Sequence, residues 1–344
     1  MESPTDETAL MTVTSSQPLP EAITVELCTN GDATLVVEPK RFVVSSEILK
    51  ISSEYFKALF SPIFQEGKAI QNRDNPEIVL HDDDPEVMEL ILSILHYRFQ
   101  DNFHHFEPHM ILQVAQHSDK YQCNKSLTPW ITQWLQNIPT GGSVSDYDCL
   151  LTAAYVFGAE QHLKAISVAA IRNLPLDFGC ESTDTLQLPD PMRAKIMNQM
   201  KQTAERIRYQ IESAHSKLRV TTTFYIMLNE PAVCHECDRI MPRGALKCHR
   251  CRNSNLQPRR CTNRTRSSDY LDFLVSVGLW PTAYAFRKLS VAQIAKKLSA
   301  ANFNKSVARC SGGKECPLRV VLEDLSEAIQ RIVDEEIEGL PVQS

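Results

Sequence analysis

The chain has 344 residues, 43% of them hydrophobic, and a formal net charge of −6 at pH 7. This length allows two or three domains and this hydrophobic share allows packed cores, so the composition excludes a wholly disordered protein. The N-terminus has neither the basic start nor the apolar core of a secretory signal, and no stretch reaches the roughly 18 apolar residues of a membrane span. We therefore expect an intracellular protein, in the nucleus, the cytoplasm or both, with no membrane partner.

The first 60 residues predict a tail, a hairpin and two short helices. Residues 1–21 are rich in Thr, Ser, Pro and Glu and show little periodicity, which is typical of a disordered tail. Residues 35–37 and 42–44 are apolar, and a Pro-containing turn separates them, as in a β-hairpin. Ser45 or Ser46 then caps a helix with an apolar side, and a second helix follows. The apolar residues of the two helices are Ile48, Leu49 and Ile51, then Tyr55, Phe56, Leu59 and Phe60.

The order of these elements resembles the BTB/POZ domain. In that family an Asp precedes the first apolar strand, and a Ser-x-Tyr-Phe-x-x-Leu-Phe helix closes the first half of the domain. Later segments resemble the family's third strand (77–80), a helix capped by Asp84, and the last two helices (111–121 and 127–135). We therefore assign residues 22–138 to a BTB/POZ domain. The residues that carry its signature are Asp32, Tyr55, Phe56, Leu59 and Phe60.

The resemblance implies binding to other proteins, through a BTB homodimer or heterodimer and through a cullin scaffold. Many members place a His and a basic residue where this chain has Ser45 and Ser46, a serine variant common in filamentous fungi, so dimerisation through the usual surface stays open. A hydrophobic-x-Glu tripeptide after the second helix contacts the cullin in some members. The residues in the corresponding place are Phe64, Gln65 and Glu66. In the alternative interpretation, the phenylalanine packs into the core and the glutamate is a surface charge.

Residues 145–230 predict a helical extension, which begins after a break at residues 139–143. Its first two helices resemble those that follow BTB domains in adaptor proteins, the BACK-like arrangement. The longest helix begins at Asp190, and ordinary packing explains its two methionines, Met197 and Met200, better than a binding groove does. The apolar faces consist of Leu150, Ala153, Ala154 and Phe157, of Leu163, Ile166, Ala170 and Ile171, and of Ile196, Met200, Ala204, Ile207, Ile211 and Leu218.

Two Cys-x-x-Cys motifs, ten residues apart, predict a small zinc knuckle within residues 231–266. In a reducing compartment the eleven cysteines are metal ligands or buried thiols rather than disulfides. Each motif brings two thiolates to one point, and four thiolates complete a tetrahedron around one structural Zn²⁺. Such a closed site folds the segment and leaves no position for catalysis. The predicted ligands are Cys234, Cys237, Cys248 and Cys251.

Alternatives for this segment stay open. In one alternative, the two motifs carry no metal. In another, a cysteine from further along the chain replaces one of the four predicted ligands. The two histidines inside the motifs are expected to face solvent rather than to ligate. The alternative ligands are Cys261, Cys310 and Cys316, the two histidines are His235 and His249, and the expected buried thiols are Cys28, Cys123, Cys149 and Cys180.

The knuckle segment is strongly basic, with nine Lys or Arg residues and no acidic residue from Arg239 to Arg266. Such a segment could contact the phosphates of a nucleic acid. It has no aromatic residue for base stacking and no obvious recognition helix, however. The favoured interpretation is therefore a solvated basic loop that docks on the acidic remainder of the protein.

The last region, residues 267–344, predicts three more helices, the last of them ending near Gly339. The fold class is thus α+β: an N-terminal BTB/POZ fold, in which helices flank a small β-sheet, followed by a mostly α-helical region with a zinc knuckle. The apolar residues of the three helices are Tyr270, Phe273, Leu274 and Val277, then Val291, Ile294, Ala295 and Leu298, then Leu318, Leu322, Leu325, Ile329 and Ile332.

No motif points to catalysis. The chain has no phosphate-binding Gly-rich loop, no Gly-x-Ser-x-Gly elbow and no His-Glu-x-x-His motif. His81 and the three Asp residues after it are interpreted as a turn and a helix cap rather than a metal or acid–base cluster. His117, Ser118 and Asp119 are consecutive on a predicted helix and point in different directions. We therefore expect a protein that is not an enzyme.

Two functional hypotheses follow from these patterns. In the first, the chain is an adaptor that binds proteins through its BTB/POZ domain, in the more specific form a substrate receptor of a cullin-based ubiquitin ligase. In the second, it is a nuclear regulator of transcription or chromatin that combines BTB-mediated assembly with its basic zinc-binding segment.

Overall fold

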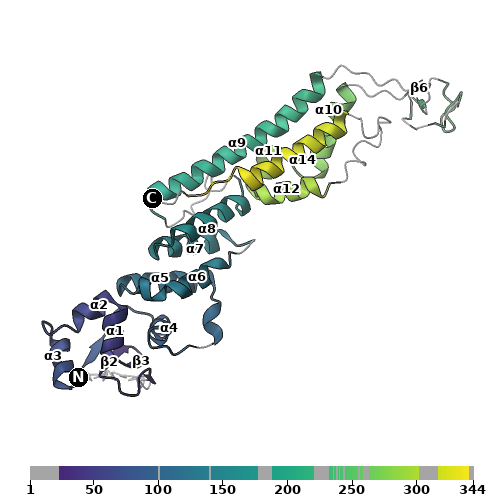
Figure 1. Cartoon of the computed structure of the whole chain (residues 1–344). Coiled ribbons are helices and arrows are strands. Elements are labelled where there is room, and N and C mark those ends of the chain that lie inside the picture. The colour runs from purple at the N-terminus through teal and green to yellow at the C-terminus, as the bar shows by residue number, and fades with distance from the viewer. Residues whose placement is uncertain are drawn as a thin grey trace, which may run out of the picture. The chain divides into compact units, whose positions relative to one another are not determined.

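The computed structural model describes residues 23–99, 101–138, 141–176, 188–220, 232–234, 236–237, 239, 241–242, 245–254, 256–258, 263–301 and 317–340. They form two compact units (Figure 1). The first unit contains the residues up to 105 together with 116–129, and the second contains 106–115 and the residues from 130 onward. In the described part of the chain, no helix combines the length and the hydrophobicity needed to cross a membrane.

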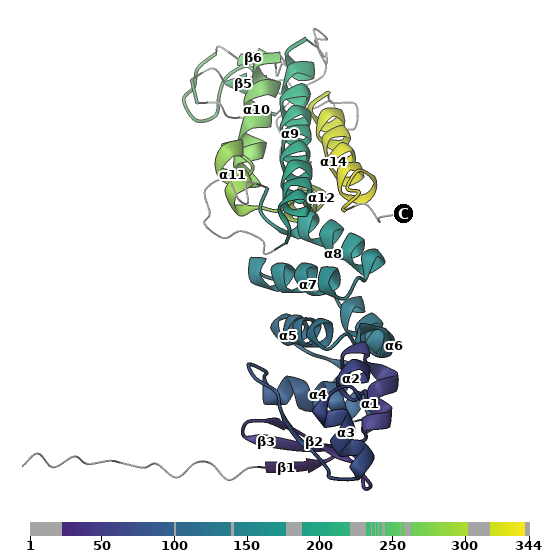
Figure 2. The same ribbon diagram turned by 90° about the vertical axis from the view of Figure 1, so that its left-hand side faces the viewer.

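The first unit is built on a four-stranded mixed sheet in the order β1-β3-β2-β4. Figure 2 labels the first three strands of the chain, β1, β2 and β3. Strands β2 (Ala33–Val37) and β3 (Lys40–Val44) pair antiparallel, which confirms the predicted hairpin. Strand β4 (Glu77–Val79) pairs parallel to β2 and confirms the predicted third strand. Strand β1 (Ile23–Glu26) pairs parallel to β3 at the sheet edge and was not predicted. Its side chains are largely exposed, so it lacks the buried face that would mark it in the sequence.

Serine caps begin the two helices that follow the hairpin. The Ser45 side chain accepts a hydrogen bond from a backbone N–H in the first turn of α1 (Ser46–Ser52). The Ser53 side chain does the same for α2 (Glu54–Leu59), over 3.1 Å. Each cap satisfies a backbone donor that a helix leaves unpaired at its start, so both predicted helices are confirmed.

Asp32 holds the N-terminus of α1 through Ser46. The backbone N–H of Ser46 donates to one carboxylate oxygen over 2.7 Å, and its hydroxyl donates to the other over 2.6 Å. A carboxylate is favourable there because the helix dipole is positive at that end. Ser46 therefore supplies two hydrogen-bond donors to the signature residue Asp32 from within the same chain. The prediction that Ile51 lies on the buried side of α1 was wrong, because it is 86% exposed and Leu49 covers the inner face.

Helix α4 (Pro85–Leu95) is the central buried helix of the first unit. Asp84 caps it by accepting from two backbone N–H groups, as predicted. Lys40 at the start of β3 fastens it to the sheet, since its ammonium lies 2.6 Å from carboxylate oxygens of both Glu86 and Glu89. The buried residues of its predicted face are Val87, Leu90, Ile91, Ile94 and Leu95.

A short 3₁₀ turn, η1 (Asp101–His104), precedes helices α5 (Pro108–Lys120) and α6 (Asn124–Gln136). Both helices lie where the sequence predicts them. Within the second unit, the ring of Trp134 on α6 contacts two phenylalanine rings, with centroids 5.8 Å away at Phe106 and 6.5 Å away at Phe157. These contacts pack α6 against the start of the helical region.

The helical region begins with α7 (Val144–Val156) and α8 (Glu160–Asn173). A capping box starts α7, because the side chains of Ser143 and Asp146 each accept from the other residue's backbone N–H. The apolar faces predicted for both helices are buried, as are Ile196, Met200, Ala204, Ile207, Ile211 and Leu218 on the next helix.

That next helix, α9 (Asp190–Val220), is the longest of the described chain and organises the second unit. It packs against α8, against α10 (Asn263–Ser276) and against α14 (Pro317–Glu335), and Figure 2 shows α10 and α14 lying beside it. Helix α12 (Val291–Ser299) packs on α8 and α14. The short helix α11 (Thr282–Lys288) was not predicted. Its seven residues span too few turns to show a helical period.

The last helix ends at Glu335, four residues before the predicted cap. Gly339 serves another purpose. Its backbone N–H donates to the Gln199 side chain over 3.2 Å, and its carbonyl accepts from the same side chain over 2.8 Å. A Cβ at this position would lie only 2.6 Å from the Ser167 hydroxyl oxygen. Gly339 therefore allows the backbone after α14 to approach α8 and α9 closely.

Several sequence-based predictions fall outside the described residues. These are the tail at 1–21, the break at 139–140, and the turn residues 243–244. The side chains concerned are those of Cys180, His235, Cys261, Cys310 and Cys316.

A buried histidine joins α4 to the start of α1. His96 Nδ1 lies 2.8 Å from the Leu92 carbonyl oxygen, and Nε2 accepts from the Ser45 backbone N–H over 3.0 Å. These two contacts require a neutral ring that carries its proton on Nδ1. Burial lowers the pKa of His96 below its usual value. Protonation would turn Nε2 into a donor and break the contact with Ser45.

We predict that the free energy of unfolding falls as the pH drops below about 6.5, the usual pKa of an unfolded histidine. The sign follows from the lowered pKa, since below 6.5 the unfolded state binds a proton that folded His96 does not. Urea unfolding at pH 7.5 and 5.5 measures the loss. The variant His96→Gln, whose amide oxygen can still accept from Ser45, should lose about 1 kcal/mol less over this interval. Equal losses in both proteins would contradict the assignment to His96.

Candidate protein-binding surface and metal centre

The loop between α2 and α3 (Gln65–Asn72) exposes two adjacent apolar side chains. Ile63 is 81% exposed and Phe64, the residue before α3, is 48% exposed. Phe64 therefore does not pack into the core, contrary to the alternative interpretation. Gln65 is exposed and Glu66 is half-buried in the first turn of α3. The three predicted contact residues thus lie together at the start of one helix.

Close backbone packing fixes this loop. A Cβ at Gly67 would lie 2.0 Å from the carbonyl oxygen of Ser61, a separation that no side chain could occupy. Glycine at this position lets α3 rest directly on the backbone that leaves α2. The exposed Ile63 and Phe64 side chains are therefore presented by a tightly held turn.

The signature aromatic residues pack beneath this surface. Phe56 is buried, and its ring centroid lies 5.7 Å from that of Phe60. It lies 5.2 Å from the ring centroid of Tyr121, a residue much later in the sequence of the domain. Tyr55 meets the Tyr121 ring edge to face at 5.1 Å and stays partly exposed. Leu59 is half-buried. Tyr121, which follows α5, therefore completes an aromatic cluster with α2.

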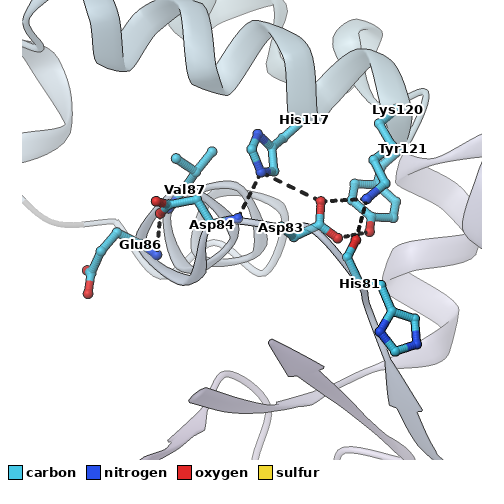
Figure 3. A network of polar contacts seen from close by, with 8 residues as sticks. All are labelled: His81, Asp83, Asp84, Glu86, Val87, His117, Lys120 and Tyr121. Carbon is cyan, nitrogen blue, oxygen red and sulfur yellow. Dashed lines mark hydrogen bonds and ion pairs between the residues drawn. The ribbon is translucent and has the colours of Figure 1, made fainter. Parts of the chain in front are cut away.

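A buried carboxylate positions Tyr121 (Figure 3). Asp83, in the turn between β4 and α4, has a side chain only 1% exposed. Its oxygens accept from the Tyr121 hydroxyl over 2.5 Å and from the Lys120 ammonium over 2.8 Å. The same ammonium donates to the backbone carbonyl of His81 over 2.9 Å, while the His81 ring points away from the cluster. Burial, and then the Asp83 carboxylate, raise the pKa of Tyr121, so its hydroxyl stays protonated and donates.

His117, which lies on α5 one helical turn before Tyr121, also contacts the loop between β4 and α4. Its Nε2 accepts from the Asp84 backbone N–H over 3.0 Å and lies 3.6 Å from an Asp83 oxygen. Ser118 instead donates to Asn124 over 2.6 Å. The three residues from His117 to Asp119 form no triad, as expected. The sequence predicts turn and cap roles for the acidic run, which Asp84 confirms, whereas the ion pair of Asp83 was missed.

Two further hydrogen bonds connect the end of α5 and the start of α6 to the junction between α1 and α2. The Ser53 hydroxyl donates to the Tyr121 carbonyl over 2.6 Å, and the Ser126 hydroxyl donates to the Ser52 carbonyl over 2.8 Å. The end of α5 thus contacts both the β4–α4 turn and the α1–α2 junction. The surface formed by α2 and α3 is consequently braced from within by Tyr121.

The four predicted cysteines come together in the second unit. Strands β5 (Ala232–Cys234) and β6 (Leu256–Pro258) pair antiparallel and bring the two ends of the segment together. The closest sulfurs belong to different motifs, 3.3 Å apart between Cys234 and Cys251 and 3.4 Å apart between Cys237 and Cys248. All four lie within 4.8 Å of one another, and these distances are too long for disulfide bonds.

The two motifs have matching backbone turns. The N–H of Cys234 donates to the carbonyl of Arg239 over 3.0 Å, and the N–H of Cys248 donates to the carbonyl of Asn253 over 2.9 Å. In both cases the acceptor lies five residues after the first cysteine of its motif. Backbone N–H groups of Cys251 and Arg250 lower the pKa of the Cys248 thiol to about 6, whereas hydrogen bonds among the four cysteines raise the pKa of Cys237 and of Cys251. Without a metal, the four thiols therefore share fewer than four negative charges.

This donor set fits a metal ion. Four thiolates around Zn²⁺, at about 2.3 Å each, lie about 3.8 Å apart, which is within the observed spread of sulfur separations. His249 is exposed, as expected, and does not join the cluster. Of the other cysteines described, Cys123 is buried and confirms the prediction of a buried thiol, whereas Cys28 and Cys149 are only half-buried.

Basic residues lie within the segment that holds the cysteine cluster. The exposed ones among the described residues are Arg239, Lys247, Arg250 and Arg252. A divalent ion with four thiolates would have a formal charge of −2. Positive charge close to such a site would lower the electrostatic cost of gathering four thiolates.

Comparison with known proteins identifies one family. The family model of the BTB/POZ domain matches residues 26–130. No curated protein matches the chain. The matched residues include strands β2 to β4, the signature aromatic residues, the α2–α3 surface and the Asp83 network, and end before the cysteine cluster.

We predict that Asp83→Ala lowers the free energy of unfolding by about 2 kcal/mol, because it leaves the buried Tyr121 hydroxyl without its acceptor. Tyr121→Phe alone should cost less, and Asp83→Ala should then cost less in the Tyr121→Phe background. Chemical unfolding of the two single variants and the double variant gives this coupling. Additive losses would show that Asp83 and Tyr121 do not act together.

Proposed function

Since residues 26–130 make this chain a BTB/POZ-domain protein, we propose that it is a non-enzymatic adaptor that recruits other proteins to a cullin-based ubiquitin ligase. A BTB/POZ domain is a protein-interaction module, so a role in protein binding follows from the domain itself. The cullin is the more specific part of the proposal, as is the intracellular location in the nucleus, the cytoplasm or both.

One observation carries the cullin proposal: the exposed pair Ile63 and Phe64 on a rigid turn. Large apolar side chains that solvent reaches on a fixed backbone are typical of protein-binding hot spots. Glu66 follows on the first turn of α3 and is half-buried, so the hydrophobic-x-Glu pattern of cullin-binding members supports the proposal at the level of sequence. The close contact at Gly67 reduces the entropy that this turn would lose on binding.

The same domain is the proposed site of BTB homodimers or heterodimers. Ile51 supports this proposal because it is an exposed apolar side chain on α1, away from the buried face of that helix. Asp32 supports it less, because its carboxylate already accepts two hydrogen bonds from Ser46. A dimer of this chain would therefore rely on apolar contact more than on a charged pocket.

We also propose that the cysteine cluster holds one structural Zn²⁺, with Cys234, Cys237, Cys248 and Cys251 as its four ligands. The metal would join the two motifs of the segment, whose ends the short strand pair β5 and β6 also brings together. The alternative function, a nuclear regulator that contacts nucleic acid through this basic segment, is less favoured, because the segment from Arg239 to Arg266 has no aromatic residue for base stacking.

We predict that the double variant Phe64→Ala, Glu66→Ala weakens cullin binding at least about 30-fold, the loss expected for hot-spot residues. Affinity purification from the protein's own cells, with nuclease treatment and mass spectrometry, would detect the cullin. Titration of the purified cullin would then give the affinity. The matched control is Tyr97→Ala, which removes another exposed side chain of the first unit. Failure of the wild-type chain to retain any cullin would refute the proposal.

We predict one zinc ion per purified chain, measured by elemental analysis. Cys248→Ser should reduce the zinc content to near zero, because three thiolates cannot close the site. Cys28→Ser, which changes a cysteine of the first unit, should leave it unchanged. Full zinc content in the Cys248→Ser variant would mean that another residue supplies the fourth ligand.

A further inference from the structure

A patch of aromatic and basic side chains lies on the connection between α10 and α11. We call it the α11 patch and define it as Trp280, Tyr284, Lys288 and Lys297. Trp280 is 48% exposed and Tyr284 is 59% exposed, and the two rings lie four residues apart in the sequence. Neither the adaptor function nor the metal site makes use of them.

The backbone around α11 directs these side chains outward. Leu279 is fully buried, and so are Ala285 and Phe286 on the inner face of α11. These three apolar residues anchor the short helix next to α10 (Figure 2). The anchoring leaves Trp280, just before the helix, and Tyr284, within it, on the solvent side. Two flat rings are therefore held at the surface by a buried apolar base.

One ammonium group lies close to these rings. The Lys288 ammonium lies 4.6 Å from the Tyr284 ring centroid and donates to the Tyr284 hydroxyl over 2.6 Å. The Lys297 ammonium belongs to α12 and lies 3.8 Å from the position that a Cβ on Gly278 would take, two residues before Trp280. The patch thus combines two exposed rings with nearby positive charge.

The sequence around the patch is basic independently of the cysteine segment. From residue 273 to residue 314 there are seven Lys or Arg residues and no acidic residue. Because the whole chain is acidic, this charge is concentrated in one stretch and would attract a polyanion.

We propose that the α11 patch binds single-stranded nucleic acid, with Trp280 and Tyr284 stacking on bases and Lys288 and Lys297 contacting phosphates. Exposed aromatic rings beside cations are the arrangement that single-strand-binding proteins use, since every base has a face on which a ring can stack. An acidic protein segment would use the charges but would have no need of two exposed rings. The proposal is independent of cullin binding, which would occur in the first unit.

The test uses the full chain and fluorescent 20-nucleotide oligo(dT) and oligo(U), with binding followed by anisotropy at several salt concentrations. Trp280→Ala and Tyr284→Ala should each weaken binding about tenfold, whereas Trp280→Phe, which keeps a ring, should retain most of it. Lys288→Gln and Lys297→Gln should each reduce the slope of log affinity against log salt by about 0.7. The matched control is Tyr209→Ala, which removes an exposed tyrosine on α9 of the same unit.

The proposal would be overturned by absence of salt-dependent binding, by tighter binding of a 20-base-pair duplex than of the single strands, by an equal loss in the Tyr209→Ala control, or by displacement of the oligonucleotides by polyglutamate at equal charge. The last result would indicate an acidic protein partner. If Trp280→Ala and Tyr284→Ala bind normally while Cys248→Ser does not, the ligand contacts the cysteine segment and not the α11 patch.

Discussion

The buried carboxylate of Asp83 is the constraint on which the first unit depends. A carboxylate out of water is costly unless donors surround it. Asp83 lies in the turn between β4 and α4, yet two of its donors, Lys120 and Tyr121, come from the end of α5. The turn and the helix must therefore be in place together. These directional contacts therefore specify the position of α5, which apolar packing alone could place in several ways.

That position in turn determines the candidate binding surface. Tyr121 stacks on Phe56, and its carbonyl accepts from the Ser53 cap, so the first turn of α2 is held by a residue nearly seventy positions later. At the other end of α2, the backbone contact at Gly67 holds α3. Ile63 and Phe64 lie between these two fixed points. Ile63 and Phe64 are exposed because contacts at both ends fix the positions of α2 and α3. The contacts of the two side chains themselves contribute little.

The sequence predicts local features well and long-range polar contacts poorly. The caps at Ser45 and Asp84, the hairpin and most of the apolar helical faces were predicted, because each is encoded within a few neighbouring residues, whereas the caps at Ser53 and Ser143 were missed. The convergence of four cysteines was predicted because their spacing alone limits the geometry. The partners of Asp83 were not, since nothing in an acidic run shows which member will be buried. Ile51 and Gly339 were misassigned for a similar reason: their roles depend on which surfaces other elements cover.

Helices α9 and α14 pack together but lie far apart in the sequence, which has a consequence for how the protein is synthesised. The apolar stripe of α9 is complete at Val220, but α14, which covers much of it, is complete only at Glu335. At typical rates of synthesis, the ribosome needs roughly 5 to 25 s to add the intervening residues. During this interval the stripe is exposed on a nascent chain, whereas the contacts of Asp83 already allow the first unit to close. The helical unit should therefore depend on chaperones during translation far more than the BTB/POZ domain does.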